Sequence, residues 1–177
     1  MARIIAFSGA GISADSGIET FQDRPGIREK LTRSFANEHP AEFAEVMKEL
    51  TADIAKAEPN AAHYALAKYD ITVITMNIDG LHQKAGSKQV INVHGDLPDI
   101  VLYEDPAPRY QEAIDLISTL TAEDTLLIIG ASNATYFAYE LKNLARWLGV
   151  EIKEIQAEAA KVLPPLLEEL VSAKEEK

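Results

Sequence analysis

A histidine, an amide and a carboxylate follow two apolar runs and are the residues best placed to do chemistry. Asn77 and Asp79 come directly after residues 71–75, and His94 follows residues 90–93. If both runs are parallel strands, the three side chains meet at the edge of the sheet where such folds bind ligands. A histidine at a strand end beside an amide and a carboxylate indicates a catalytic rather than a structural role.

The first apolar run ends in a glycine-rich turn. Residues 8–14 read Ser-Gly-Ala-Gly-Ile-Ser-Ala and fit the G-x-G-x-x-G/A pattern, with Ala14 in the third place. In that pattern Gly9 permits the tight turn, Gly11 lets the backbone approach a pyrophosphate, and Ala14 allows close packing of a helix. The N-terminus of that helix would offer free N–H groups to the phosphates. The turn therefore predicts a nucleotide site on the same edge as His94.

The acidic residue of ordinary dehydrogenases has no counterpart in this chain. Those enzymes place a second strand, ending in an acid, about 20 residues beyond the turn. Here residues 19–37 are polar, contain several arginines and lack a clear periodicity, so we expect a long loop with at most one helical turn. This disfavours a hydride-transfer enzyme of the common type.

The elements that must position these residues alternate between short apolar runs and helical stretches. This alternation predicts an α/β fold with a parallel sheet covered on both faces: a three-layer Rossmann-like domain with about six parallel strands. We expect strands at residues 4–7, 71–75, 90–93, 100–102, 125–129 and 150–155. We expect helices at residues 40–57, 59–69, 109–120, 137–148 and 163–173. No linker divides the chain, so residues 1–177 are expected to form one domain.

Composition excludes several classes of protein. The chain has no cysteine, which excludes disulfides, a thiolate zinc site and a cysteine nucleophile. Its net charge of −11 repels nucleic acid and anionic lipid but tolerates a basic peptide. No apolar run approaches the length of a membrane span, and residues 1–3 lack the layout of a signal peptide. We therefore expect a cytoplasmic protein.

Several motifs in one order together resemble the sirtuin family of NAD-dependent protein deacylases. They run in the family's order from residue 4 to about residue 155, nearly the whole length of the chain. The residues that carry the resemblance are Gly9-Ala10-Gly11-Ile12-Ser13, Ser16-Gly17-Ile18 with Phe21, Pro59-Asn60-Ala61-Ala62-His63, Asn77-Ile78-Asp79-Gly80-Leu81-His82 and His94-Gly95. Weaker matches are residues 98–104 and Gly130-Ala131-Ser132.

The resemblance implies chemistry on NAD and acyl-lysine, in which the acyl group is transferred to the ribose. His94 matches the general base of the family, and Asn77 matches the amide that organises the ribose and a water. Asp79 matches the acid that holds the nicotinamide carboxamide, and Phe21 the aromatic that shields the reacting carbon. The expected cofactor-binding residues are Gly9, Ala10, Gly11, Ile12, Ser13, Phe21, Asn77, Asp79, Gly130 and Ser132. The resemblance thus implies NAD and an acyl-lysine peptide or protein as partners.

The chain also departs from the family pattern. Gln22 stands where sirtuins have arginine, and Met76 stands where they have glutamine. Only Asp96 and Leu97 separate His94-Gly95 from Pro98, where the family inserts its zinc ribbon, so no zinc is expected. The insertion at about residues 19–58 is reduced, and Gln156 stands near the place of an asparagine that contacts the adenine ribose.

These departures leave alternatives to deacylation. One is an NAD glycohydrolase or ADP-ribosyltransferase, because water can replace the acyl acceptor when the peptide groove is reduced. Another is a non-catalytic module that binds NAD or ADP-ribose, which the lost arginine and glutamine favour and the retained Asn77, Asp79 and His94 oppose. The acyl preference, the target protein and the oligomeric state are not readable from the sequence.

Overall fold

A computed structural model describes residues 2–19, 23–131 and 136–175 and has one five-stranded parallel sheet at its centre. The strand order is β3-β2-β1-β6-β7, with every neighbouring pair parallel. The strands are β1 (Ile4–Ser8), β2 (Thr72–Thr75), β3 (Val90–Asn92), β6 (Thr125–Ile129) and β7 (Glu151–Ile155). The central strands β1 and β6 are buried along their whole length, as their continuous apolar sequences predict.

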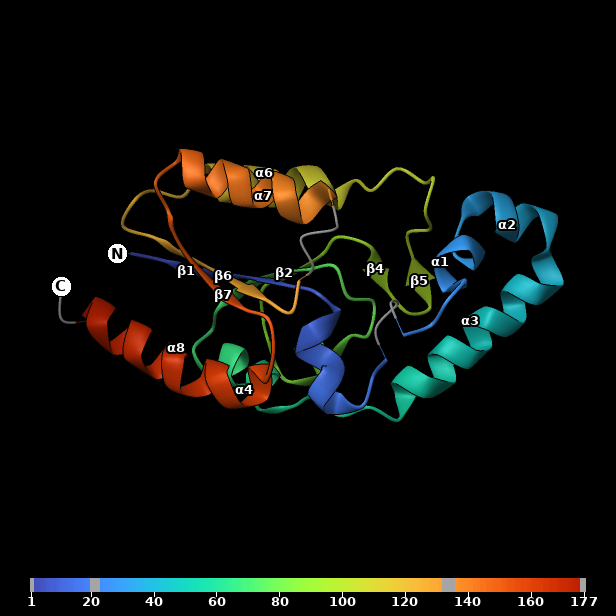
Figure 1. The fold of residues 1–177 in the computed structure, drawn as a ribbon, viewed down its shortest axis with the longest axis horizontal. Helices are drawn as coiled ribbons and strands as arrows, with labels where there is room; N and C mark the ends of the chain where they lie inside the picture. The colour runs from blue at the N-terminus through green and yellow to red at the C-terminus, as the bar shows by residue number, and fades with distance from the viewer. Residues whose placement is uncertain (1, 20–22, 132–135, 176–177) are drawn as a thin grey trace.

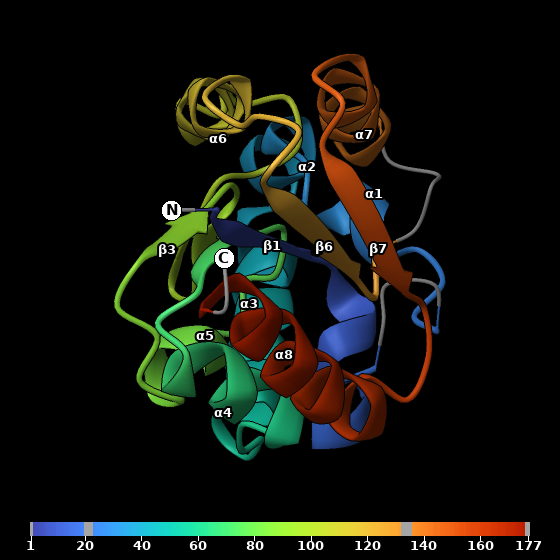
Figure 2. The same ribbon diagram turned by 90° about the vertical axis from the view of Figure 1, so that its left-hand side faces the viewer.

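Helices cover both faces of this sheet and make the three layers (Figures 1 and 2). On one face α4 (Ala61–Lys68) packs beside α8 (Ala159–Glu175), and on the other α6 (Arg109–Ser118) packs beside α7 (Tyr136–Trp147). Two core clusters result. Leu66 and Leu163 belong to the cluster under α4 and α8, whereas Ile117 and Leu141 belong to the cluster under α6 and α7. The predicted three-layer α/β fold is confirmed.

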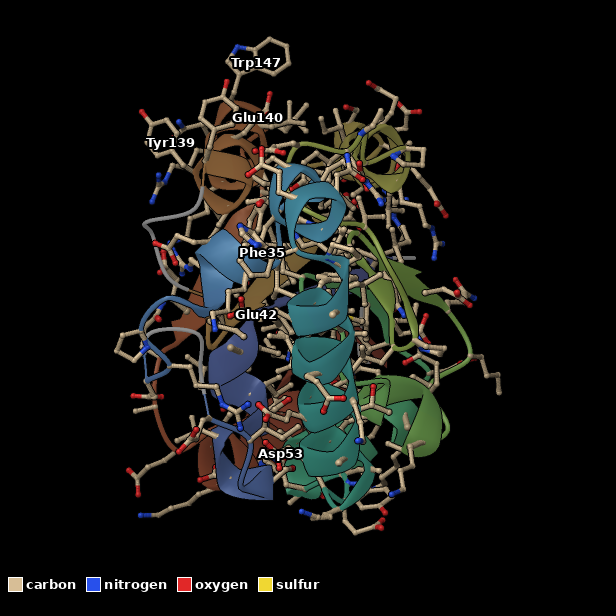
Figure 3. All side chains as sticks on the ribbon, turned by 90° about the vertical axis from the view of Figure 1, so that its right-hand side faces the viewer. Phe35, Glu42, Asp53, Tyr139, Glu140 and Trp147 are labelled. Atoms are coloured by element: carbon tan, nitrogen blue, oxygen red, sulfur yellow. The ribbon has the colours of Figure 1, made fainter. Side chains whose placement is uncertain are left out.

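A smaller group of elements lies beyond one end of the sheet, at the right of Figure 1. It comprises α1 (Ile27–Lys30), α2 (Arg33–Glu38), α3 (Pro40–Ala55) and a hairpin of β4 (Gly95–Asp96) and β5 (Asp99–Ile100). Its own small core contains Leu31, Val46 and Leu50. Figure 3 views this end, with Phe35 on α2 and Glu42 and Asp53 on α3 labelled.

The expectation of a long loop at residues 19–37 is wrong, because this segment contains α1 and most of α2. Thr32 caps the N-terminus of α2, because its side-chain oxygen accepts a hydrogen bond from the backbone N–H of Phe35. This cap is local, so the helix forms without the apolar periodicity that would have predicted it. The expectation that residues 1–177 form one domain stays a prediction.

The expected strand at residues 100–102 does not join the sheet, which has five strands rather than about six. Gly95 has a φ of +70°, and a Cβ there would lie 2.3 Å from the carbonyl oxygen of Asp99. The chain therefore folds back into the β4–β5 hairpin instead of continuing beside β3. The helices predicted at 40–57, 59–69, 109–120 and 137–148 are present within a few residues.

Three further helices differ from expectation. The C-terminal helix begins at Ala159, so Pro164 and Pro165 lie inside α8 rather than at its start. The short α5 (Leu81–Lys84) was not expected. The glycine turn is followed by η1 (Ala10–Ser16), a 3-10 helix of seven residues rather than an α-helix. Among the described residues, none of the helices combines the length and apolar content that a membrane span requires.

Candidate functional site

The strand register brings the predicted polar residues to one edge of the sheet. Ser8 at the end of β1 is paired with Thr75 of β2 and with Ile129 of β6, and Thr75 is paired with Asn92 of β3. The segments that follow these strands carry Gly9, Asn77, His94 and Gly130. The chain order reverses on the two sides of β1, so the crevice between β1 and β6 is the topological switch point where such sheets bind ligands.

The turns after β1 and β6 are in backbone contact through three glycines. Gly9 N–H donates to the Ile129 carbonyl and Gly11 N–H to the Gly130 carbonyl, each at 2.9 Å. A Cβ on Gly11 would lie 2.7 Å from Gly130 Cα, and one on Gly130 would lie 2.4 Å from the backbone of Gly11. The glycine at 11 is therefore required by the neighbouring turn of the protein itself. Ala14 is exposed, so the packing expected of the third small residue is not seen.

Ser13, Asn77 and Asp79 form a hydrogen-bonded cluster that lines the same cavity as this turn. Ser13 Oγ donates to Asp79 Oδ2 at 2.7 Å, and Asn77 Nδ2 lies 3.1 Å from Ser13 Oγ and 3.2 Å from Asp79 Oδ2. The other carboxylate oxygen of Asp79 accepts the backbone N–H of Leu81 at 3.0 Å. These contacts hold the carboxylate and the amide in place before any ligand binds.

A buried layer of polar side chains supports the cluster from below. Asn77 N–H donates to Thr75 Oγ1 at 3.1 Å, and Ser8 Oγ donates to the same atom at 2.9 Å. His82 Nε2 lies 2.9 Å from Ser8 Oγ. His82 thus shares the Ser8 hydroxyl with Thr75 in one buried hydrogen-bonded chain. Burial lowers the pKa of His82 to about 3, so this histidine is a neutral structural group.

His63 and Asn60 join helix α4 to this layer. The His63 ring lies 4.9 Å from that of His82, centroid to centroid, and its Nδ1 accepts the backbone N–H of Asn60 at 3.3 Å. The amide of Asn60 donates to the Ile12 carbonyl at 2.8 Å and to Ser16 Oγ at 3.0 Å. Burial lowers the pKa of His63. The layer thus ties η1 to α4 and explains the Pro-Asn-Ala-Ala-His motif as support for the site.

His94 lines the same cavity as the cluster of Ser13, Asn77 and Asp79. Its Nε2 lies 3.2 Å from the hydroxyl oxygen of Tyr110 on α6, and the Tyr103 ring is 6.5 Å away. Burial lowers the pKa of His94, so its imidazole is neutral at pH 7. The contact with Tyr110 carries no local sequence signal, because it joins residues 16 positions apart on different elements.

One cavity of about 1050 Å³ connects these parts. Most predicted site residues line it: Gly9, Ala10, Gly11, Ser13, Asn77, Asp79, His94 and Gly130. Ile12 instead has its side chain wholly buried in the core under α4 and α8. Phe21 and Ser132 lie outside the described residues. Met76 and Gln156, the departures from the family pattern, also line the cavity.

The outer wall of the cavity contains residues that sequence reasoning did not single out. Leu50, Ile54 and Tyr103 supply apolar and aromatic surface. Arg24 also lines the cavity and pairs with two carboxylates, with Nε 2.9 Å from Glu19 Oε2 and Nη2 2.6 Å from Asp53 Oδ2. The helical periodicity of α3 indicates that Leu50 faces inward. That α3 forms part of the cavity wall depends on tertiary packing, which the sequence does not show.

The described residues contain no group of three or more His, Cys, Asp or Glu side chains placed to hold a metal ion. The expectation that the chain folds without zinc stays a prediction.

Comparison with known proteins gives matches over most of the chain. A family model described as the Sir2 family matches residues 9–97. The chain is 30% identical to NAD-dependent protein deacylase 2 of Pyrobaculum aerophilum, over 90% of this chain and 82% of that protein. It is 33% identical to the NAD-dependent protein deacetylase of Bacillus anthracis, over 73% of this chain and 72% of that one.

Solved structures agree with these matches. A Sir2 protein with a p53 peptide and NAD⁺ superposes with a TM-score of 0.82 at 27% identity, covering 96% of this chain and 94% of that one. A complex of a Sir2 homologue with NAD superposes with a TM-score of 0.85 at 21% identity, covering 97% and 90%. The second likeness, at its low identity, bears on the fold alone.

Proposed function

The chain belongs to the Sir2 family, and from this premise we propose that it is an NAD-dependent protein deacylase with His94 as its general base. One observation carries the proposal: the glycine turn, the Ser13–Asn77–Asp79 cluster and His94 all line the same cavity. The names of the relatives, which describe deacylases and deacetylases that depend on NAD, support it.

The residues present fit NAD. The turn at Gly9–Gly11 brings backbone to the cavity at the switch point of the sheet, where a pyrophosphate is expected. Asp79 supplies carboxylate acceptors for a carboxamide N–H, and Ser13 and Asn77 hold that carboxylate in position. When bound, NAD supplies a ribose carbon with nicotinamide as its leaving group. We assign Ala10, Gly11 and Gly130 to the phosphate and ribose side, and Asp79 to the nicotinamide side.

The part played by His94 follows from its protonation state. A neutral imidazole in the cavity wall can take a proton from a ribose hydroxyl, and burial keeps the ring neutral at pH 7. Asn77, whose amide contacts Ser13 Oγ and whose backbone N–H donates to Thr75 Oγ1, is the residue that we propose to organise the ribose. We assign Asn77 to orientation and His94 to proton transfer.

An acyl-lysine peptide is the proposed second substrate. The Sir2 structure that contains both a p53 peptide and NAD⁺ supports this assignment. The net charge of −11 favours a lysine-rich partner. Leu50, Ile54 and Tyr103 give the outer wall the apolar character that an acyl-lysine stem requires. The expected cytoplasmic location belongs to the same proposal, and imaging of a fluorescent fusion of the full chain tests it.

The direct test is incubation of the purified protein with NAD, with and without an acetyl-lysine peptide, while nicotinamide release is followed by chromatography. Release that requires the peptide, together with deacetylated peptide by mass spectrometry, is the predicted result. Release without peptide would replace the proposal by NAD hydrolysis. Calorimetric NAD binding without release under either condition would replace it by a binding module.

A further inference from the structure

The hydroxyl of Tyr110 contacts the one histidine that the proposed reaction uses. The Tyr110 oxygen is 3.2 Å from His94 Nε2, and the two rings meet edge to face at 72° with their centroids 5.5 Å apart. The sirtuin resemblance does not include Tyr110. The contact is a property of this chain that calls for its own explanation.

The Tyr110 ring is fixed by packing. It stacks on Phe137 of α7 with a centroid distance of 4.3 Å and an interplanar angle of 8°. Phe137 in turn meets Phe7 of β1 edge to face at 6.0 Å, inside the core. Because a stacked ring has little rotational freedom, the hydroxyl is held at one point, and it is aimed at His94.

The two ring nitrogens of His94 have different surroundings. Nε2 faces Tyr110. Within the described part of the chain, Nδ1 has no hydrogen-bond partner, and it is not among the buried unpaired side-chain atoms found there. His94 lines the cavity, so Nδ1, the nitrogen that does not contact Tyr110, is the one left for the cavity side of the ring.

We propose that Tyr110 is a positioning residue whose hydroxyl oxygen accepts a hydrogen bond from the Nε2–H of His94. This contact leaves the Nδ1 lone pair facing the cavity as the basic atom. This inference rests on the proposed function, in which His94 is the general base. A neutral imidazole has one N–H and one lone pair, and the partner of the N–H decides which nitrogen is the base.

The same contact raises the basicity of His94. When Nδ1 takes a proton from a substrate hydroxyl, the ring becomes an imidazolium and its Nε2–H continues to donate to the Tyr110 oxygen. No proton leaves Tyr110, so the only transfer is from the hydroxyl to Nδ1. A hydrogen bond from a charged donor is about twice as strong as a neutral one, so Tyr110 favours the protonated ring. Burial and neighbouring Tyr103 raise the pKa of Tyr110, which keeps it a phenol.

Other titratable groups near His94 do not account for the shift of its pKa. Tyr103 is the other titratable side chain packed near the ring, at 6.5 Å. The charged side chains lining the same cavity are Glu19, Arg24, Arg28, Asp53, Lys56 and Asp79. Burial, rather than any of these charges, lowers the pKa of His94. In the proposed arrangement, the hydrogen bond to Tyr110 offsets part of the lowering of the His94 pKa by burial.

Nuclear magnetic resonance of the imidazole nitrogens tests the inference without requiring catalysis. The chain has only four histidines, and the signals that vanish in His94→Asn identify His94. In the wild type we expect the neutral ring to carry its proton on Nε2. In Tyr110→Phe, which retains the stack on Phe137, we expect a mixture of tautomers and a titration midpoint lower by about half a unit to one unit.

Tyr103→Phe is the matched control for this measurement, because it removes a hydroxyl from the neighbouring ring. It should leave the His94 tautomer unchanged and move the midpoint by less than about a quarter of a unit, since its ring is 6.5 Å away. A wild-type ring protonated on Nδ1, or an unchanged tautomer and midpoint in a folded Tyr110→Phe protein, would overturn the inference.

Kinetics give a second readout. In Tyr110→Phe the acid limb of the pH profile of peptide-dependent nicotinamide release should move to lower pH by the same amount as the titration midpoint. Tyr139→Phe, at an exposed position on α7, should leave the profile in place. If the wild type releases no nicotinamide, the proposed function fails while the tautomer measurement still decides the role of Tyr110. If the wild type is active and its acid limb does not move in Tyr110→Phe, the role of Tyr110 fails alone.

Discussion

The backbones of Gly11 and Gly130 touch, so that a Cβ placed on Gly11 would lie 2.7 Å from Gly130 Cα. The two glycines belong to the turns after β1 and β6, on either side of the switch point of the sheet. The Gly11 N–H also donates to the Gly130 carbonyl. The glycine-rich turn is therefore shaped by contact between two loops of the protein as much as by the ligand it is expected to hold.

The first prediction concerns this contact. Gly11→Ala should lower the free energy of unfolding by about 2–3 kcal/mol, because backbone atoms cannot move aside as a flexible side chain can. NAD affinity should fall together with stability. Gly86→Ala is the matched control: no atom lies within 4 Å of its Cβ position and only its φ of +96° opposes the change, which costs about 1 kcal/mol. Thermal unfolding and calorimetric NAD titration measure both effects. Equal costs for the two variants would contradict the contact.

The second prediction concerns Asp79. Asp79→Asn replaces one carboxylate oxygen by an NH₂ group, so one of the donors now directed at that carboxylate loses its acceptor. We expect the KM for NAD to rise at least tenfold, which corresponds to about 1.4 kcal/mol, with a smaller change in melting temperature. Asp70→Asn, at an exposed position that pairs with Lys88, should change neither quantity appreciably. A folded Asp79→Asn protein with an unaltered KM would remove Asp79 from the nicotinamide side of the site.

The third prediction concerns His82 and the pH dependence of stability. Burial holds the pKa of His82 near 3 in the folded chain, below the value of about 6.5 expected when unfolded. Below pH 6.5 the unfolded chain therefore binds a proton that the folded chain does not. Stability falls as the pH is lowered from about 6.5 toward 3. In His82→Gln the slope of the unfolding free energy against pH should be shallower by up to about 1.4 kcal/mol per unit.

His39→Gln, at an exposed position, is the control for that slope. Denaturant unfolding at a series of pH values between 7 and 4.5 measures all three proteins. Parallel curves for the wild type and His82→Gln would mean that His82 does not titrate on unfolding in this range.

Much of the site follows from two regularities of the sequence. Short β-branched runs predicted parallel strands, and the carboxyl ends of parallel strands meet at one edge. That reasoning places Asn77 and His94 in one cavity, although they are 17 positions apart in the sequence. The helix at residues 40–57 was predictable because its proline start at Pro40 and its apolar spacing are local signals.

What could not be predicted depends on contacts between distant segments. The burial of Ile12 in the core, rather than in the cavity, is decided by how η1 packs against α4 and α8. The contact of Tyr110 with His94 needs the positions of α6 and of the segment after β3. The hairpin at Gly95 was hidden because Ile100 and Leu102 are as apolar as strand residues, and only the backbone turn directs them away from the sheet.

The central claim, that this cavity cleaves NAD with His94 as the base, is tested most directly by His94→Ala. Nicotinamide release in the presence of NAD and an acetyl-lysine peptide should be measured for the wild type and the variant, at equal concentrations of folded protein checked by calorimetry. The claim predicts a loss of turnover of about two to four orders of magnitude, with much less change in NAD affinity. A folded His94→Ala protein that retains wild-type turnover would contradict it.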